Sequence, residues 1–214
     1  MAAVISVASL AGGVAIAILI ALDEVRHPQH MWIMNLVWSI CALFGTVFVL
    51  GAYLAYGRAH PHRNVPFAVT VGIGAAHCGS GCTLGDLIAE WLACFYPATA
   101  IIFGWQSLFA EKMFAVWILD FILAFGFGIV FQYCAIVPMR NLSPRQDIIA
   151  ALKADMLSLT AWQIGLYGFM AFAQFYLFRR LLHTSLDTAS AEFWLMMQIA
   201  MIYGFITSYP VNGG

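Results

Sequence analysis

The sequence predicts an all-α integral membrane protein with about six transmembrane helices in a bundle. Of its 214 residues, 63% are hydrophobic and only 9% are charged, with a net charge of -1. Soluble globular proteins are about one-quarter charged, so this chain has too little polar surface to face water. A spanning helix needs about 20 apolar residues, so a chain of this length holds about six spans and no sizeable domain outside the bilayer.

The same composition excludes several other classes of protein. A nucleic-acid-binding protein carries a basic face, and nine basic residues against ten acidic ones do not provide it. A disordered chain is poor in hydrophobic residues, which is the opposite of what is found here. We therefore expect the lipid bilayer to be the main partner, and we expect no nucleic acid.

Apolar runs divide residues 1–214, a single transmembrane domain, into the expected spans. The first run ends at Asp23 and Glu24 and lacks both the basic start and the cleavage site of a secretory signal, so we expect a retained anchor helix. The second begins at Pro28, a residue suited to the first helical position. The expected spans are residues 2–22, 28–56, 83–103, 113–137, 156–178 and 191–208.

Residues 66–82 form a lead-in to the third span that contains too few apolar residues to cross by itself. Gly79 and Gly81 are expected to break the helix there, and Thr83 with Asp86 fits a capping pattern for a new start. Irregular backbone at membrane depth is tolerated where it lines a cavity or is buried in protein. The sequence thus predicts a re-entrant or broken segment at His77–Cys82, and it points to a site there.

The basic residues favour one orientation by a narrow margin. With six spans, the connections on the N-terminal side carry five basic residues and the opposite side carries four. Because cytoplasmic connections are richer in Lys and Arg, this favours a cytoplasmic N-terminus. The five are Arg58, Arg63, Arg140, Arg145 and Lys153, and the four are Arg26, Lys112, Arg179 and Arg180.

Three acidic residues, Asp86, Glu90 and Asp120, fall inside expected spans. A charge at the centre of a membrane helix costs about 2.5–3.5 kcal/mol, so such residues are candidates for function. Asp86 and Glu90 lie one turn apart, and together with Cys82 they occupy an arc of roughly 80° on one helix. We expect this face to look into the bundle.

The string His77-Cys78-Gly79-Ser80-Gly81-Cys82 adjoins that face. One imidazole and two thiols can supply three ligands to a soft or borderline metal ion, and a helix start near Cys82 would favour the thiolate. The sequence therefore predicts a transition-metal site, with copper first and zinc second. Its expected ligands are His77, Cys78, Cys82, Asp86 and Glu90.

Further residues could extend a metal path. His30, Met34 and Cys41 fall within about 40° of arc on the second span, and Met197 and Met201 are at helical spacing on the sixth. Thioether, thiol and imidazole suit Cu(I), although a row of Met is also a common packing feature. Asp120 joins this set of additional candidates, whereas interhelical hydrogen bonding explains polar residues such as Gln163 and Gln174.

The leading hypothesis is thus a membrane protein that binds and transports a soft metal ion. The alternatives are a thiol–disulfide or electron-transfer component that uses Cys78 and Cys82, and a non-enzymatic scaffold subunit that assembles with other membrane proteins. A proton or small-solute carrier that uses Asp86, Glu90 and Asp120 is a further alternative. Hydrolysis and phosphoryl transfer have no support, because the sequence lacks a phosphate loop, a G-x-S-x-G elbow and an H-E-x-x-H helix.

Four strings of the sequence resemble one family. They are His27-Pro28-Gln29, Met31-Trp32-Ile33-Met34-Asn35, His77-Cys78-Gly79-x-Gly81-Cys82-Thr83-Leu84-Gly85-Asp86 and Thr207-Ser208-Tyr209-Pro210-Val211-Asn212. The chain resembles an uncharacterised family of bacterial polytopic membrane proteins, classed only as a domain of unknown function. The resemblance implies a multi-pass protein of the bacterial inner membrane, supports treating the motif residues as a unit, and implies no activity.

Overall fold

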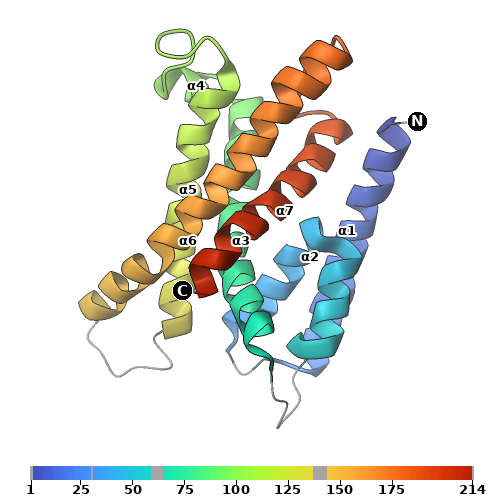
Figure 1. The fold of residues 1–214 in the computed structure, drawn as a ribbon. Coiled ribbons are helices and arrows are strands. Elements are labelled where there is room, and N and C mark those ends of the chain that lie inside the picture. Colours follow the sequence, from blue (N-terminus) through green and yellow to red (C-terminus); the bar gives the residue numbers. More distant parts are fainter. Residues whose placement is uncertain (1, 30, 59–64, 137–143, 214) are drawn as a thin grey trace.

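The computed structural model describes residues 2–29, 31–58, 65–136 and 144–213, and these residues form a helical bundle (Figure 1). The helices are α1 (Ala2–Arg26), α2 (Ile33–Ala52), η1 (Tyr53–Gly57), α3 (Phe67–Phe95), α4 (Ala98–Ile102), α5 (Lys112–Ile136), α6 (Pro144–Phe172), η2 (Ala173–Leu181) and α7 (Ala191–Gly213). The segments η1 and η2 are π-helical continuations of α2 and α6.

The helix α3 lies at the centre of the bundle, where it contacts α2, α5, α6 and α7 (Figure 1). Both α5 and α7 run antiparallel to it. The Lys112 side chain at the start of α5 contacts Ala93 near the end of α3, and Tyr209 near the end of α7 contacts Ala68 near the start of α3. The packing therefore buries the middle of α3 against its neighbours, while Phe67, Ile88 and Phe95 stay exposed.

Five of the described helical segments are long and apolar enough to cross a membrane, which confirms an all-helical, multi-pass membrane protein. They are Ala2–Arg26, Ile33–Gly57, Phe67–Phe95, Lys112–Ala135 and Met156–Leu181. The helix α7, which corresponds to the expected sixth span, is not among them. Large apolar side chains such as Ile5, Phe48 and Ile102 are exposed on the outside, where lipid would cover them.

The segment Ile33–Gly57 turns back on itself. Thr46 has φ 43° and ψ -123°, which interrupts α2, and the Gln29 side chain donates a hydrogen bond to the carbonyl oxygen of Gly57 at 2.6 Å. A straight helix from Ile33 to Gly57 would separate its ends by about 36 Å. The expected second span, residues 28–56, is therefore a re-entrant helical hairpin whose ends lie at the same end of the bundle (Figure 1).

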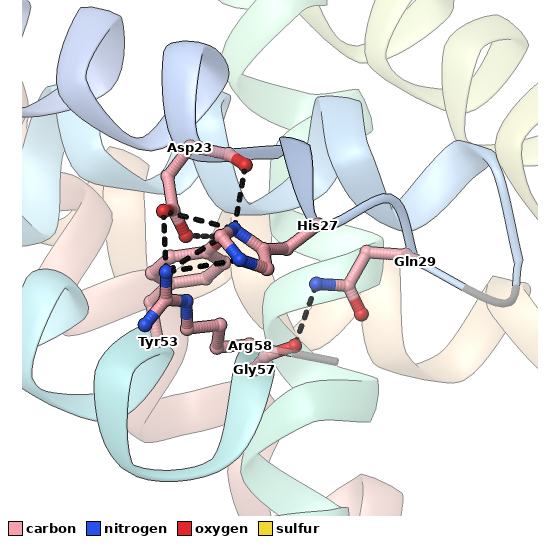
Figure 2. Close-up of polar contacts among 6 residues, drawn as sticks. All are labelled: Asp23, His27, Gln29, Tyr53, Gly57 and Arg58. Carbon is pink, nitrogen blue, oxygen red and sulfur yellow. Dashed lines mark hydrogen bonds and ion pairs between the residues drawn. The ribbon is translucent and has the colours of Figure 1, made fainter. Parts of the chain in front are cut away.

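A polar cluster holds the foot of this hairpin against the end of α1 (Figure 2). The Asp23 carboxylate accepts a hydrogen bond from the Tyr53 hydroxyl at 2.8 Å and one from the Arg58 guanidinium at 3.0 Å. The His27 ring lies 3.2 Å from the same carboxylate. Asp23 therefore links the end of α1 to η1, 30 residues further along the chain.

The expected break in the third span is wrong, because α3 is a continuous α-helix from Phe67 to Phe95. Its N-cap is Pro66, and the Thr83 hydroxyl donates to the Gly79 carbonyl at 2.8 Å inside the helix instead of capping a new one. The two glycines permit close packing. A Cβ at Gly79 would collide with the Trp162 ring, and one at Gly81 would lie 2.9 Å from the Gly128 nitrogen.

The hairpin is testable by cross-linking. With the native cysteines replaced, a variant carrying Gln29→Cys and Arg58→Cys should be joined by a short bifunctional thiol reagent, since residues 29 and 57 are in contact. The cross-link is measured by mass spectrometry of the digested protein. A control pair, Gln29→Cys with Ser185→Cys, should not be joined. Labelling at both positions 29 and 58 without a cross-link would contradict the hairpin.

Candidate intramembrane carboxylate site

A stripe of small residues brings α3 and α5 into close contact. Gly81, Gly85, Ala89 and Ala93 recur every four residues, and a Cβ at Gly85 would collide with the backbone of Ala124 on α5. Small residues at such spacing let two membrane helices approach closely. The neighbouring face of α3, which carries Asp86 and Glu90, is consequently enclosed by protein.

The three intramembrane acids are all buried, which confirms the inward face predicted for Asp86 and Glu90. Asp86 is 0% exposed, Glu90 is 5% exposed and Asp120 on α5 is 1% exposed. The three carboxyl groups lie close enough to interact electrostatically with one another. Lys112, whose ammonium group donates to the Ala93 carbonyl at 2.9 Å, acts on Glu90 as the nearby positive charge.

Partners for these acids come from distant parts of the sequence. The Gln163 amide donates to one Asp86 oxygen at 3.2 Å, and the Thr188 hydroxyl donates to one Glu90 oxygen at 3.0 Å. Three further buried acceptors have no hydrogen-bond partner among the residues that the structure describes, namely Asp86 Oδ2, Asp120 Oδ1 and Gln163 Oε1. This cluster therefore has more acceptors than donors, and protons or a cation would correct the imbalance.

A cavity of about 120 Å³ lies beside Glu90 and Thr188. This volume is enough for several water molecules, since one needs roughly 10–15 Å³ by this measure. Its lining also includes Glu111, Lys112 and Gln174. Water can therefore reach the Glu90 carboxyl group from the end of the bundle at which α3 ends and α5 begins.

An ion pair stands at the rim of this cavity. The Arg179 guanidinium donates two hydrogen bonds to Glu111, at 2.9 and 3.0 Å. These hydrogen bonds hold the pKa of the Glu111 carboxyl below its ordinary value, so this group is ionised at neutral pH. The Arg179 guanidinium neutralises the Glu111 charge, so this ion pair is a fixed polar contact beside the cavity.

The predicted metal ligands on α3 do not converge. At about 100° per residue, a continuous helix places His77 roughly 100° from Cys78 and 140° from Cys82. The His77 ring instead packs near the Phe131 ring on α5, with 6.2 Å between centroids. Among the residues that the structure describes, no group of three or more His, Cys, Asp or Glu side chains is arranged to hold a metal ion. The copper or zinc site stays a prediction.

The sulfur-containing residues of the additional path pack in the hydrophobic core. Met34 and Met197 are buried there, the Cys41 thiol donates to the Ala76 carbonyl at 3.3 Å, and the Met201 sulfur accepts a hydrogen bond from Thr83 at 3.7 Å. None of these contacts involves Asp86, Glu90 or Asp120. His30 lies outside the described residues.

Thr188 is a site residue that the sequence does not predict, and Gln163 is predicted only as an interhelical hydrogen-bonding group. The Gln163 interpretation is confirmed, with Asp86 as its partner. Thr188 lies in the connection before α7, 98 residues from Glu90. A single hydroxyl in a polar connection carries no sequence signal that would connect it with an acid in a distant helix.

A methyl group added at the close contact between α3 and α5 should destabilise the bundle. Gly85→Ala should lower the free energy of unfolding by about 1–3 kcal/mol, since the added methyl group meets the Ala124 backbone. Gly126→Ala is the matched control, because nothing lies within 4 Å of its Cβ position. This control should be neutral or slightly stabilising. Both are measured by unfolding in detergent micelles, and equal stability of the two variants would contradict the contact.

A family model described as Domain of unknown function (DUF4396) matches residues 69–213. The matched region runs from the first turn of α3 to the end of α7, so it contains the whole carboxylate cluster and its partners. The hairpin and α1 precede it. No curated protein and no solved structure matches the chain.

Proposed function

We propose that this chain, which belongs to the DUF4396 family (a domain of unknown function), is a proton-conducting membrane protein. Asp86, Glu90 and Asp120 bind the protons in this proposal. Gln163 and Thr188 orient two of the three carboxyl groups by the hydrogen bonds that they donate.

One observation carries this proposal, the surplus of buried hydrogen-bond acceptors. Asp86 Oδ2, Asp120 Oδ1 and Gln163 Oε1 are buried without a donor. A buried carboxylate without a partner costs several kcal/mol, and neighbouring carboxylates repel each other. A proton on a carboxyl group removes its charge and also supplies the missing donor. The cluster therefore favours a state in which it carries protons.

The arrangement favours protons over a metal ion. The three acids share an electrostatic environment, yet in the described parts of the chain they do not form a common ligand sphere. A proton needs only one acceptor at a time, so it can be held where a metal ion cannot. Soft metal transport through Cys78 and Cys82 is the alternative from the sequence, and no contact among the described residues favours it.

The order of the acids supports movement of protons as well as storage. Glu90 borders the cavity, and Asp86 lies one turn further along α3, about 6 Å in rise. Asp120 interacts electrostatically with both. Protons from water in the cavity would reach Glu90 first and then the two inner groups. The proposal places the protein in the bacterial inner membrane, as the family resemblance implies.

Infrared difference spectroscopy tests proton binding. The wild-type protein at neutral pH should show the carbonyl band of protonated carboxyl groups, and Asp120→Asn should lose part of it, because an amide cannot take up a proton in that way. Glu192→Gln is the matched control, since it makes the same chemical change outside the site. An absent band would contradict the proposal, and stoichiometric copper that Cys78→Ser abolishes would favour the metal alternative.

Proton conduction is tested in proteoliposomes that enclose a pH-sensitive dye, with a membrane potential imposed by a potassium gradient and valinomycin. Asp86→Asn and Asp120→Asn should each reduce proton flux at least tenfold, whereas Glu192→Gln should leave it unchanged. The physical reason is that both positions lose the group that binds and releases the proton. Flux in both Asp variants equal to that of the wild type would overturn the proposal.

A further inference from the structure

The re-entrant hairpin changes which basic residues lie together. Because Ile33–Gly57 returns to the end at which it starts, Arg26 and Arg58 lie at the same end of the bundle. Arg58 and Asp23 are in direct contact there (Figure 2). With six straight spans these two arginines would face opposite sides of the membrane.

Four of the seven basic residues that the structure describes belong to one end of the bundle, Arg26 and Arg58 among them. α6 also begins at this end, and its first turns carry Arg145 and Lys153 ahead of the span that starts at Met156. The sequence adds Arg63 and Arg140 in connections whose flanking residues lie at this end. The opposite end has Lys112, Arg179 and Arg180. The positive-inside rule therefore makes the hairpin end cytoplasmic.

This orientation reverses the one expected from six spans. α1 runs antiparallel to the first arm of α2, since Gly13 packs against Leu43 while Glu24 meets Ser39. The start of α1 thus lies away from the hairpin foot and faces the extracytoplasmic side. The same chain path brings the end of α7 to the hairpin end, since Tyr209 contacts Ala68 at the start of α3 (Figure 1).

The cavity beside Glu90 lies at the end with fewer basic residues. Its lining includes Glu111 and Lys112 before and at the start of α5, and Leu186 and Thr188 in the connection before α7. These segments are at the opposite end of α3 from the hairpin foot (Figure 1). The cavity is therefore on the extracytoplasmic side in this orientation.

The connection of residues 182–190 is held over the cavity by three hydrogen bonds. The Thr188 hydroxyl donates to Glu90, the Leu186 amide donates to the Gln174 side chain at 2.9 Å, and the Trp194 indole donates to the Thr188 carbonyl at 2.8 Å. Thr188 is thus the point at which this connection meets the carboxylate cluster. A bulky group at this position would fill the cavity.

We propose that the carboxylate site takes its protons from the extracytoplasmic side, through the cavity between Glu90 and Thr188. This inference rests on the proposed proton conduction, and it adds the side from which the site is loaded and the residue at which loading can be blocked.

The test uses the full chain with its native cysteines replaced. Ser185→Cys, at the cavity end, and Val65→Cys, at the hairpin end, both place the thiol at exposed positions. In spheroplasts, a membrane-impermeant thiol reagent should label position 185, and it should label position 65 only after permeabilisation. The reverse pattern would overturn the orientation and with it the proposed side of loading.

Thr188→Cys tests the cavity itself. Labelling from outside with the same bulky reagent should reduce proton flux at least tenfold relative to the unlabelled variant, whereas labelled Ser185→Cys should conduct as before. Complete labelling at position 188 without loss of flux would overturn the proposed route. If position 185 is labelled from outside but the wild-type protein conducts no protons, the orientation holds and proton conduction fails, so the two failures are distinguishable.

Discussion

The close contact between α3 and α5 is the interaction on which the rest of the structure depends. Gly85 has no side chain where the Ala124 backbone passes, and Gly81 meets Gly128 in the same way one turn earlier. This contact turns the adjacent face of α3, with Asp86 and Glu90, toward protein instead of lipid. Because an ionisable group facing hydrocarbon is costly, three buried carboxyl groups are tolerated only in such an enclosed position.

A second constraint comes from the foot of the hairpin. Asp23 accepts hydrogen bonds from Tyr53 and Arg58, so the segment that begins at Ile33 is held at the same end of the bundle when it reaches Gly57. This contact gathers the basic residues at one end and leaves the cavity beside Glu90 at the other. The polar cluster at the hairpin foot and the carboxylate cluster are thus linked through the path of the chain, although they do not touch.

Much of the fold could be predicted because hydropathy is a local property. The long apolar runs predict helices, and the spacing of Asp86 and Glu90 predicts an inward face that the burial of both residues confirms. Gly79 and Gly81 were interpreted as helix breakers, which is their usual effect in water, yet in α3 they serve close helix contacts. The reversal at Thr46 was missed because residues 33–57 are apolar and long enough to span.

By itself, the sequence determined the solvent of this protein, its all-helical class and the few acids that must avoid lipid. These follow from side-chain polarity and the 3.6-residue repeat, which act over one or two turns. Only the tertiary structure decided where the chain reverses, that His77 turns away from Cys78 and Cys82, and that Gln163 and Thr188 meet Asp86 and Glu90. The Gln163–Asp86 contact spans 77 positions of the sequence and the Thr188–Glu90 contact spans 98, so both depend on how whole helices pack.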